Sequence, residues 1–498
     1  MADPRTAAQR RAVAELLRVS PVADELGRRF AGAGYELYLV GGSVRDALLG
    51  RLGEDLDFAT DASPERVLEV VAGWAEATWT TGIAFGTVGV QRAGLRLEIT
   101  TYRTDSYDRV GRKPAVTYGE SLDGDLARRD FTVNAMAVSL PGHEFVDHYS
   151  GLADLAARRL RTPGAPADSF ADDPLRLMRA ARFAAQVGFT VDESVVEAME
   201  KLAPQIGRVS AERVRDELSK LLCGADPRAG LHLLVRTGVA DVVLPELPAL
   251  RMEIDEHHQH KDVYAHTLTV LEQAIALEGS SGPDLVLRLA ALLHDIGKPA
   301  TRRKEPAGGV SFHHHEGVGA KLVRKRLTAL RYPRDVVDPV AKLVFLHLRF
   351  HGYGKGEWTD SAVRRYVTDA GDLLDRLHRL VRADSTTRNQ RRAAALARSY
   401  DSLEARIAVL REREELDAIR PDLDGNQIMA LLGVGPGPEV GQAYRHLMEL
   451  RLEQGPLGEE RATEELRRWA AAGAGDAASD AASDAASPRA PGPIRPRG

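Results

Sequence analysis

Hydrophobic and polar positions alternate in several short segments of the first third of the chain. The apolar run 37–40 ends in two glycines, and residues 55–58 alternate between acidic and apolar side chains. Residues 87–90 and 95–99 follow the same kind of pattern and are joined by a turn at residues 92–94. Alternation is typical of half-buried strands, and such a short connection predicts a β-hairpin.

Helical patterns at residues 43–50 and 64–77 interrupt these strands, and a helical segment over residues 1–34 precedes them. Strands that are mixed with helices in this way indicate one α/β domain. We predict that this domain covers residues 1–160.

From about residue 168 the pattern changes to helical spacing, as in residues 174–187, and clear strand signals do not return. We therefore predict that the rest of the chain is all-α. We expect a helical domain over 161–255, a second over 256–395, a third over 396–470, and a disordered tail over 471–498. The tail is predicted because its Asp-Ala-Ala-Ser repeats and its Pro/Arg/Gly end lack the apolar side chains of a core.

The composition is that of an ordinary globular protein, with 44% hydrophobic and 28% charged residues among 498. The single cysteine, Cys223, excludes an intramolecular disulfide and indicates a reducing compartment. Neither a long apolar run nor a signal-peptide core is present, so we expect a cytoplasmic protein with no membrane partner. The net charge of −5 leaves nucleic-acid binding open, because phosphate binding needs only a local basic face.

Two glycines and two aspartates indicate a nucleotide site near the N-terminus. Gly41 and Gly42 lie between a predicted strand and a predicted helix, where a triphosphate can approach the backbone and the free N–H groups of the helix start. Asp55 and Asp57 are two apart on a predicted strand, so their side chains point to the same side. Two adjacent carboxylates favour a cation between them, and Mg²⁺ is the natural one beside phosphates.

Five ordered motifs resemble those of class II tRNA nucleotidyltransferases and bacterial poly(A) polymerases. They are LVGGSVRDALLGR at 39–51 with Asp-Leu-Asp at 55–57, RRDFTVNAMA at 128–137, a looser motif at 147–161, DDPLRLMRAARF at 172–183, and SAERVRDEL at 210–218. The family usually has Glu at the position of Asp172, whereas Asp173 and Arg176 keep the pattern. The resemblance implies a polymerase beta-like head domain over 1–160 and a nucleotide-selecting, RNA-binding neck over 161–255.

The same resemblance implies a two-metal reaction that joins nucleotides from CTP and ATP to a tRNA 3′ end and releases pyrophosphate. Asp55 and Asp57 would hold Mg²⁺, and Glu98 is a candidate third carboxylate. Asp130 is suited to accept a hydrogen bond from a ribose hydroxyl. The residues expected to bind the nucleotide are Gly41, Gly42, Ser43, Arg45, Arg129, Asp130, Asn134, Asp173, Arg176, Arg179 and Arg182.

Asp173 and Arg176 are expected to choose the base. They are three apart in a predicted helix, which would place their side chains on one face. A carboxylate accepts hydrogen bonds and a guanidinium donates them, so the pair complements the edges of cytosine and adenine and opposes those of uracil and guanine. Residues 103–120 correspond to the family's flexible loop, which enzymes that add only CC are said to lack. The presence of this segment argues against CC-only addition.

A second set of residues resembles the HD phosphohydrolase superfamily. His294 and Asp295 follow the apolar segment 285–293, with one histidine upstream and further candidates downstream. The implied metal ligands are His266, His294, Asp295, His315, His347 and Asp384. Imidazole and carboxylate ligands suit Mg, Mn, Ni or Fe.

Three functional alternatives remain beside CCA addition by this chain. A poly(A) polymerase or an enzyme that adds only A would share nearly all the motifs. An HD-type phosphohydrolase with a vestigial transferase domain is the third. The intact carboxylates at 55 and 57 argue against the last, and the acidic, Ala-rich C-terminus argues against a poly(A) polymerase, which often ends in a strongly basic segment.

Overall fold

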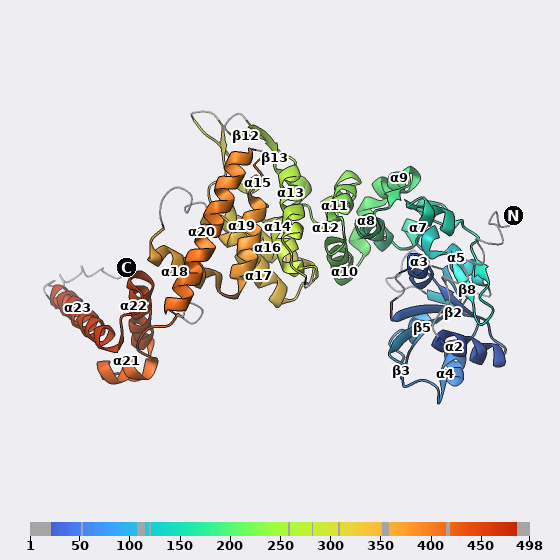
Figure 1. Cartoon of the computed structure of the whole chain (residues 1–498), viewed down its shortest axis with the longest axis horizontal. Coiled ribbons are helices and arrows are strands. Elements are labelled where there is room, and N and C mark those ends of the chain that lie inside the picture. Colours follow the sequence, from blue (N-terminus) through green and yellow to red (C-terminus); the bar gives the residue numbers. More distant parts are fainter. Residues whose placement is uncertain are drawn as a thin grey trace, which may run out of the picture.

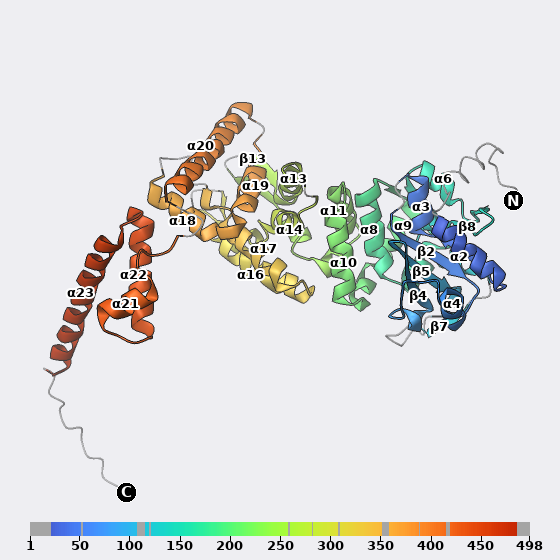
Figure 2. The same cartoon turned by 60° about the horizontal axis from the view of Figure 1, so that its bottom comes forward.

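The computed structural model describes residues 21–50, 53–106, 115–118, 121–256, 259–280, 282–306, 309–350, 358–387, 389–414 and 419–485. The chain forms an elongated succession of domains, with the mixed α/β head at one end and α21, α22 and α23 at the other (Figure 1). The second view shows the same order of domains along the long axis (Figure 2). No described helix combines the length and the apolar character needed to cross a membrane.

The head is built on a seven-stranded sheet of order β3-β4-β5-β2-β1-β8-β9. Its strands are β1 (Leu37–Val40), β2 (Asp55–Thr60), β3 (Ala77–Trp79), β4 (Thr87–Arg92), β5 (Leu95–Thr101), β8 (Ala137–Ser139) and β9 (Phe145–Val146). β2 and β5 run parallel, whereas the other neighbouring pairs are antiparallel. The strands predicted from alternation are therefore confirmed.

Local sequence explains these strands well. In β2 the side chains of Asp55 and Asp57 are exposed, whereas Leu56 and Phe58 are buried. The turn between β4 and β5 places Ala93 and Gly94 at φ values of 50° and 80°. Positive φ at both turn positions suits the right-handed twist of a two-residue hairpin.

Helices pack on both faces of this sheet and complete the head. The helices are α2 (Pro21–Gly32), α3 (Gly42–Leu48), α4 (Pro64–Val71), α5 (Leu122–Ala127) and α6 (Gly151–Ala156). Buried side chains of α2 and α4 pack with one face of β2, β4 and β5. On the other face Leu122 and Leu126 of α5 cluster with Val40 of β1 and Ala59 of β2, and Asp55 and Asp57 of β2 project from the same face. After β5 the described parts of segment 103–120 form the antiparallel pair β6 (Arg103–Ser106) and β7 (Ala115–Tyr118), while 107–114 and 119–120 lie outside the described residues.

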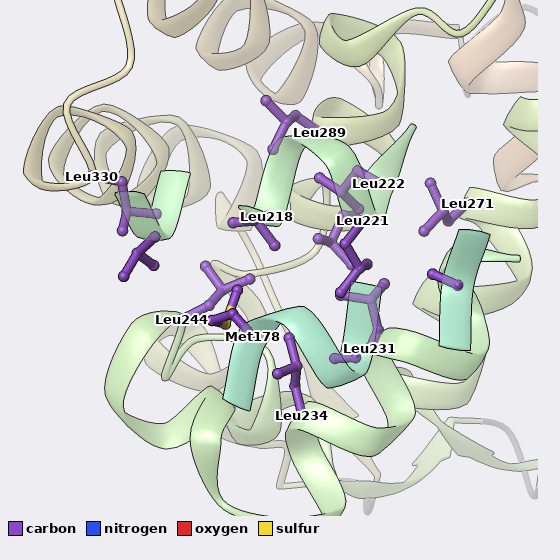
Figure 3. Packing of buried hydrophobic residues seen from close by; sticks show 14 of the residues in the cluster. Met178, Leu218, Leu221, Leu222, Leu231, Leu234, Leu244, Leu271, Leu289 and Leu330 are labelled. Carbon is purple, nitrogen blue, oxygen red and sulfur yellow. The ribbon is translucent and has the colours of Figure 1, made fainter. Parts of the chain in front are cut away.

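The neck is helical as predicted. It comprises α7 (Pro166–Asp172), α8 (Leu175–Val187), α9 (Glu193–Leu202), α10 (Ala211–Leu222), α11 (Pro227–Arg236) and α12 (Val239–Val243), with the small parallel pair β10 (Arg159–Leu160) and β11 (Thr190–Val191) at its border with the head. Helix α8 packs against α10 and α11. Figure 3 shows how this core continues into the next domain, because Leu218 and Leu222 of α10 lie between Met178 of α8 and Leu289 of α14.

The third domain is a bundle of longer helices. They are α13 (Val263–Ala276), α14 (Leu285–Leu293), α16 (His315–Ala329), α17 (Arg334–Leu346), α18 (Asp360–Ala370), α19 (Leu374–Asp384) and α20 (Gln390–Glu414), with the one-turn helix α15 (Lys298–Thr301). Two hairpins, β12 (Glu253–Glu256) with β13 (Gln259–Asp262) and β14 (Arg303–Lys304) with β15 (Val310–Ser311), were not expected after residue 168. β14 and β15 have two residues each, below the length at which alternation gives a signal. β12 and β13 contain a single apolar residue, Ile254, so they show no alternation.

The C-terminal helices α21 (Gly425–Leu432), α22 (Pro438–Gln454) and α23 (Glu459–Ala485) share a small core of their own. Disorder was expected from residue 471, whereas α23 continues as a helix to Ala485. Alanine has the highest helix propensity, so the composition that excludes a core still favours a helix. Residues 486–498 lie outside the described residues.

Candidate active site and metal centre

The candidate catalytic carboxylates form a row across β2 and β5. The parallel register pairs Asp57 with Glu98 and Asp55 with Arg96, so these side chains project from the same face of the sheet. Asp55, Asp57 and Glu98 are all exposed. The structure thus brings the third candidate carboxylate directly beside the second, and this donor set fits Mg²⁺, which prefers carboxylate oxygens.

The start of α3 lies next to Asp57. The backbone N–H of Asp57 donates to Ser43 Oγ at 2.9 Å, which fixes the strand against the helix. A Cβ on Gly42 would lie 3.9 Å from Asp57 Oδ2, and Gly41 adopts a φ of 68°, which favours glycine. The glycines therefore bring bare backbone close to the carboxylates, as the sequence predicts.

The pKa of Asp57 is raised. Desolvation by the surrounding protein is the largest cause, and the carboxylates of Glu98 and Asp55 add to it, while Arg129 and Arg45 oppose it. Crowded carboxylates of this kind are stabilised by a cation.

A chain of hydrogen bonds runs from α3 across the head and into the neck. Arg45 Nη1 donates to Asn134 Oδ1 at 2.6 Å, and Asn134 Nδ2 donates to Asp130 Oδ1 at 2.9 Å. Arg179 Nε of α8 donates to Asp130 Oδ2 at 2.7 Å, so this carboxylate joins the two domains. The predicted residues Arg45, Asn134, Asp130 and Arg179 therefore lie in one network.

Asp130 already has a donor for every acceptor position. Oδ1 accepts from the N–H of Phe131 as well as from Asn134, and Oδ2 accepts from two nitrogens of Arg179. A carboxylate offers about four such positions. Burial raises its pKa, but Arg179 and Asn134 outweigh burial and hold the pKa at about 2.

The pair Asp173 and Arg176 differs from its expected geometry. Asp173 precedes α8 in an extended conformation, and α8 starts only at Leu175. Pro174 explains this, because proline disfavours the helical conformation of the residue before it. The helical-face argument for the pair is therefore wrong, although both residues still lie at the border of head and neck.

Each member of this pair is held by a different partner. Asp173 Oδ2 accepts from Arg213 Nη2 of α10 at 2.8 Å. Arg176 Nη1 donates to Ser169 Oγ at 2.7 Å, and Arg176 Nη2 donates to the carbonyl of Arg128. Both side chains are thus oriented before any base arrives.

Several supporting residues were not predicted as site residues. Asp125 binds Arg128 and Arg129, Asp154 binds Thr132, Arg159 and Arg161, Glu217 binds Arg182 and Arg179, and Arg213 binds Asp173. Asp125, Asp154 and Glu217 are buried acids, which rarely occur without a cationic partner. All except Asp125 lie within the recognised motifs, so their place beside arginines in those strings was the signal available.

The HD candidates converge in the third domain. The six side chains come from five places: α13 for His266, the end of α14 for His294 and Asp295, the start of α16 for His315, the end of α17 for His347, and the end of α19 for Asp384. They form two groups in which one ligand atom of each residue lies within 4.8 Å of the others. One group is His266, His294 and Asp384, and the other is Asp295, His315 and His347.

Three buried imidazoles of this cluster are oriented for metal binding. Nδ1 of His294, His315 and His347 lies 2.8, 2.9 and 2.6 Å from the backbone carbonyls of Ala291, Phe312 and Val344, so each can donate its Nδ1 proton. The opposite nitrogens, Nε2, are buried and have no hydrogen-bond partner among the described residues. Such nitrogens suit a divalent transition metal.

Two histidines of this cluster have strongly shifted pKa values, and a lysine lies beside it. Burial lowers the pKa of His294, but Asp295 and Asp384 outweigh it and raise the pKa to about 10. Burial and the neighbouring His294 lower the pKa of His347 to about 4. Lys298 Nζ lies 2.8 Å from Asp295 Oδ2, so a cation already neighbours the cluster.

Comparison with known protein families covers three parts of the chain. Residues 37–161 match the poly A polymerase head domain, and residues 188–250 match a probable RNA- and SrmB-binding site of polymerase A. Residues 263–408 match the HD domain.

Two similar proteins align along nearly their whole length. The A-adding tRNA nucleotidyltransferase of Deinococcus radiodurans is 36% identical over 445 residues, which are 87% of this chain and 95% of that protein. The CC-adding tRNA nucleotidyltransferase of Thermus thermophilus is 34% identical over 441 residues, which are 87% of this chain and 94% of that protein. The CCA-adding enzyme of Latilactobacillus sakei is 36% identical over 273 residues, which are 53% of this chain and 66% of that protein.

Among solved structures, the CCA-adding enzyme of Bacillus stearothermophilus in complex with CTP aligns with a TM-score of 0.66 and 25% identity. The alignment covers 92% of this chain and all of that one. The likeness in sequence and in fold extends over head, neck and HD domain, and it agrees with the motifs and the geometry of the carboxylates. The chain therefore belongs to the family of tRNA nucleotidyltransferases.

Proposed function

We propose that this chain adds CCA to the 3′ end of tRNA without a template, using CTP and ATP and releasing pyrophosphate. The observation that carries the proposal is the row of Asp55, Asp57 and Glu98 beside the glycine-rich start of α3. In each step the terminal 3′ oxygen of the tRNA would form a bond to the α-phosphorus of the nucleotide, and the bond to pyrophosphate would break. The hydroxyl proton leaves with a base or with solvent.

The three carboxylates would hold Mg²⁺, which supplies a positive charge for the triphosphate and lowers the pKa of the attacking hydroxyl. Gly41 and Gly42 would let the triphosphate approach the backbone. Arg45, Arg129, Arg179 and Arg182 would bind its phosphates, and the buried acids Asp125 and Glu217 hold three of these arginines in place. Preset cations of this kind stabilise the transition state without reorganisation.

Base selection is assigned to Asp173 and Arg176. Arg213 fixes the carboxylate of Asp173, and Ser169 with the Arg128 carbonyl fixes the guanidinium of Arg176. An oriented acceptor and donor would match cytosine or adenine, and uracil or guanine would leave both groups unpaired.

A-only and CC-only addition are the main alternatives, because the two relatives that align along nearly their whole length carry these names. The experiment uses three transcripts of one tRNA. The first ends at position 73 and lacks CCA, the second ends after CC, and the third ends after the complete CCA. Addition of three nucleotides to the first transcript from CTP and ATP supports CCA addition. An enzyme that extends only the second transcript, by one A, would be an A-adding enzyme. An enzyme that adds only CC to the first transcript would be a CC-adding enzyme.

A second function is proposed for the HD domain. Two groups of three potential ligands, with three imidazoles already oriented by backbone carbonyls, support hydrolysis of a phosphoester with divalent metal. The test measures metal content after purification and hydrolysis of 2′,3′-cyclic AMP in the presence of Mg²⁺, Mn²⁺, Ni²⁺ or Fe²⁺. A chain that binds none of these metals and cleaves no cyclic phosphate would contradict this second function.

A further inference from the structure

A tryptophan lies in the same row of the sheet as the candidate catalytic carboxylates. The strand registers pair Trp79 of β3 with Gly89 of β4, Gly89 with Glu98 of β5, and Glu98 with Asp57 of β2. Residues that pair across neighbouring strands project from the same face. The indole of Trp79 therefore shares its face of the sheet with both carboxylates.

Gly89 makes room for this ring. A Cβ at position 89 would lie 2.0 Å from both Cε2 and Nε1 of Trp79, so any other residue would displace the indole. The ring thus covers the backbone of β4 and is directed toward β5 instead of away from the sheet. Trp79 remains partly exposed, so part of its surface is open to a ligand.

The sheet order places Trp79 on the opposite side of the carboxylates from the proposed nucleotide site. The glycines of α3, Arg45 and Asp130 lie on the side of β1 and β8, whereas Trp79 lies beyond β5 on β3. In phosphoryl transfer the attacking oxygen and the leaving group are roughly in line. If the triphosphate lies on the β1 side, the acceptor hydroxyl must come from the side of Trp79.

Arg96 adds a cation at the same place. Its guanidinium carbon lies 5.6 Å from the centre of the Trp79 ring, and its Nε lies 3.9 Å from Asp55 Oδ1. The side chain is 67% exposed, so it is accessible to an anion. An arginine beside an aromatic ring is a combination that binds single-stranded nucleic acid.

We propose that Trp79 and Arg96 form the subsite for the terminal nucleotide of the growing RNA strand. Trp79 stacks on the base and Arg96 contacts the phosphate of that nucleotide. This inference rests on the proposed transferase function. Stacking also suits that function, because the terminal base of the RNA differs at each step of the addition. Every base has a π face, so stacking tolerates this change whereas hydrogen-bond recognition would not.

The experiment combines variants of Trp79 with changes in the RNA. Addition of the first C is measured on a minihelix that ends in a normal nucleotide at position 73 and on one whose position 73 lacks the base. For wild-type protein, loss of the base is expected to raise the KM for RNA about tenfold, within the range for one stacked base. In Trp79→Ala the KM for the normal minihelix is expected to rise by a similar factor, and removal of the base should then have little further effect. The KM for CTP should stay unchanged in both cases.

Two further variants separate stacking from packing. Trp79→Phe keeps an aromatic face and is expected to retain most of the affinity, whereas Trp79→Leu fills space over Gly89 and should behave like Trp79→Ala. Gly89→Ala should displace the indole and reproduce the loss without removing the tryptophan. Thermal melts check that each variant folds.

Three outcomes would overturn the subsite. The first is an equal loss of affinity for RNA on removal of the base in wild type and in Trp79→Ala. The second is full activity of Trp79→Leu. The third is a rise in the KM for CTP with no rise in the KM for RNA. Failure of wild-type protein to extend any minihelix would instead contradict the proposed function itself, so the two failures are distinguishable.

Discussion

Arg179 of α8 donates two hydrogen bonds to Oδ2 of Asp130, and this contact ties the neck to the head at the proposed nucleotide site. Asp130 is buried, whereas Arg179 is partly open and also lies 3.7 Å from Glu217. The position of Arg179, which we propose to bind phosphate, therefore depends on a carboxylate in the neighbouring domain.

Asp130→Asn tests whether this carboxylate positions Arg179 or contacts the ribose. Because its four acceptor positions are used within the protein, we expect the KM for CTP and ATP to rise about 10- to 100-fold, the effect of losing charged hydrogen bonds. The preference for CTP over dCTP should stay the same. Steady-state kinetics with both nucleotides provides the measurement, and a selective gain of dCTP use would instead support the ribose contact expected from the sequence.

Arg179→Ala should change the pH dependence of nucleotide addition. Asp130 has its pKa lowered from 3.8 to about 2, so the stability it contributes is present above 3.8 and is lost as the pH falls through about 2. Without Arg179, burial is less well opposed and the pKa of Asp130 rises. The acid limb of the kcat/KM profile should therefore move to higher pH than in wild type. An unchanged acid limb would show that Asp130 does not depend on Arg179 for its charge.

Arg176→Ala should relax the choice of nucleotide. Removal of the donor leaves only the acceptor Asp173, so incorporation of UTP or GTP relative to CTP should increase. Arg213→Ala should shift selectivity in the same direction but less, because Asp173 stays in place and loses only the bond that orients it. Competition assays with CTP and UTP on one tRNA measure both variants. If Arg176→Ala slows all nucleotides equally, its bonds to Ser169 and Arg128 serve the structure alone.

The sequence predicted strand β2, which carries the candidate catalytic aspartates, because alternation is a local signal. Asp55 and Asp57 follow from alternation within β2, and their neighbours Leu56 and Phe58 are buried as expected. The place of Glu98 beside Asp57 depends on the parallel pairing of β2 with β5, which joins strands that are distant in sequence. Such pairing is set by the tertiary fold, so the sequence alone identified Glu98 as a candidate carboxylate but did not place it beside Asp57.

Non-local contacts also explain what the sequence missed. The helix predicted at 174–187 is present, yet Pro174 moved its start to Leu175 and left Asp173 outside it. Asp173 instead accepts a hydrogen bond from Arg213 of another helix. The spacing of residues along the sequence does not predict a contact between two helices. Glu217 was missed for the same reason, because its partners Arg179 and Arg182 lie on another helix.

Arg288 should be important for the joint between neck and HD domain. This buried residue of α14 binds Glu278 at 2.6 Å and donates to the carbonyls of Leu222 and Gly224 at the end of α10. Arg288→Leu leaves Glu278 as an unpaired charge, so the free energy of unfolding should fall by about 3–5 kcal/mol. Combining it with Glu278→Leu should restore part of this loss, as urea unfolding followed by circular dichroism can measure. No recovery in the double variant would show that the lost carbonyl contacts dominate.

The two proposed sites should be separable. His294→Ala with Asp295→Ala is expected to abolish metal binding and phosphoester hydrolysis in the HD domain and to leave CCA addition largely intact, since the carboxylates of the head are untouched. Metal analysis, cyclic phosphate hydrolysis and tRNA extension are measured on the same preparation. His313→Ala is a matched control, because this exposed histidine lies next to the cluster but is not one of its ligands. If tRNA extension is lost while the thermal melt is unchanged, the HD cluster belongs to the transferase machinery.

The most direct test of the central claim is extension of a tRNA lacking its CCA end by wild-type protein and by Asp57→Asn, with CTP, ATP and Mg²⁺. Asp61→Asn serves as the control, because Asp61 follows the same strand but is not part of the row of carboxylates, and its Oδ1 accepts from the backbone N–H of Glu36 and from the hydroxyl of Thr60. We predict three added nucleotides with wild type and with the control, and none with Asp57→Asn despite an unchanged melt and unchanged tRNA binding. Near-wild-type extension by Asp57→Asn would contradict the assignment of this row of carboxylates as the catalytic centre.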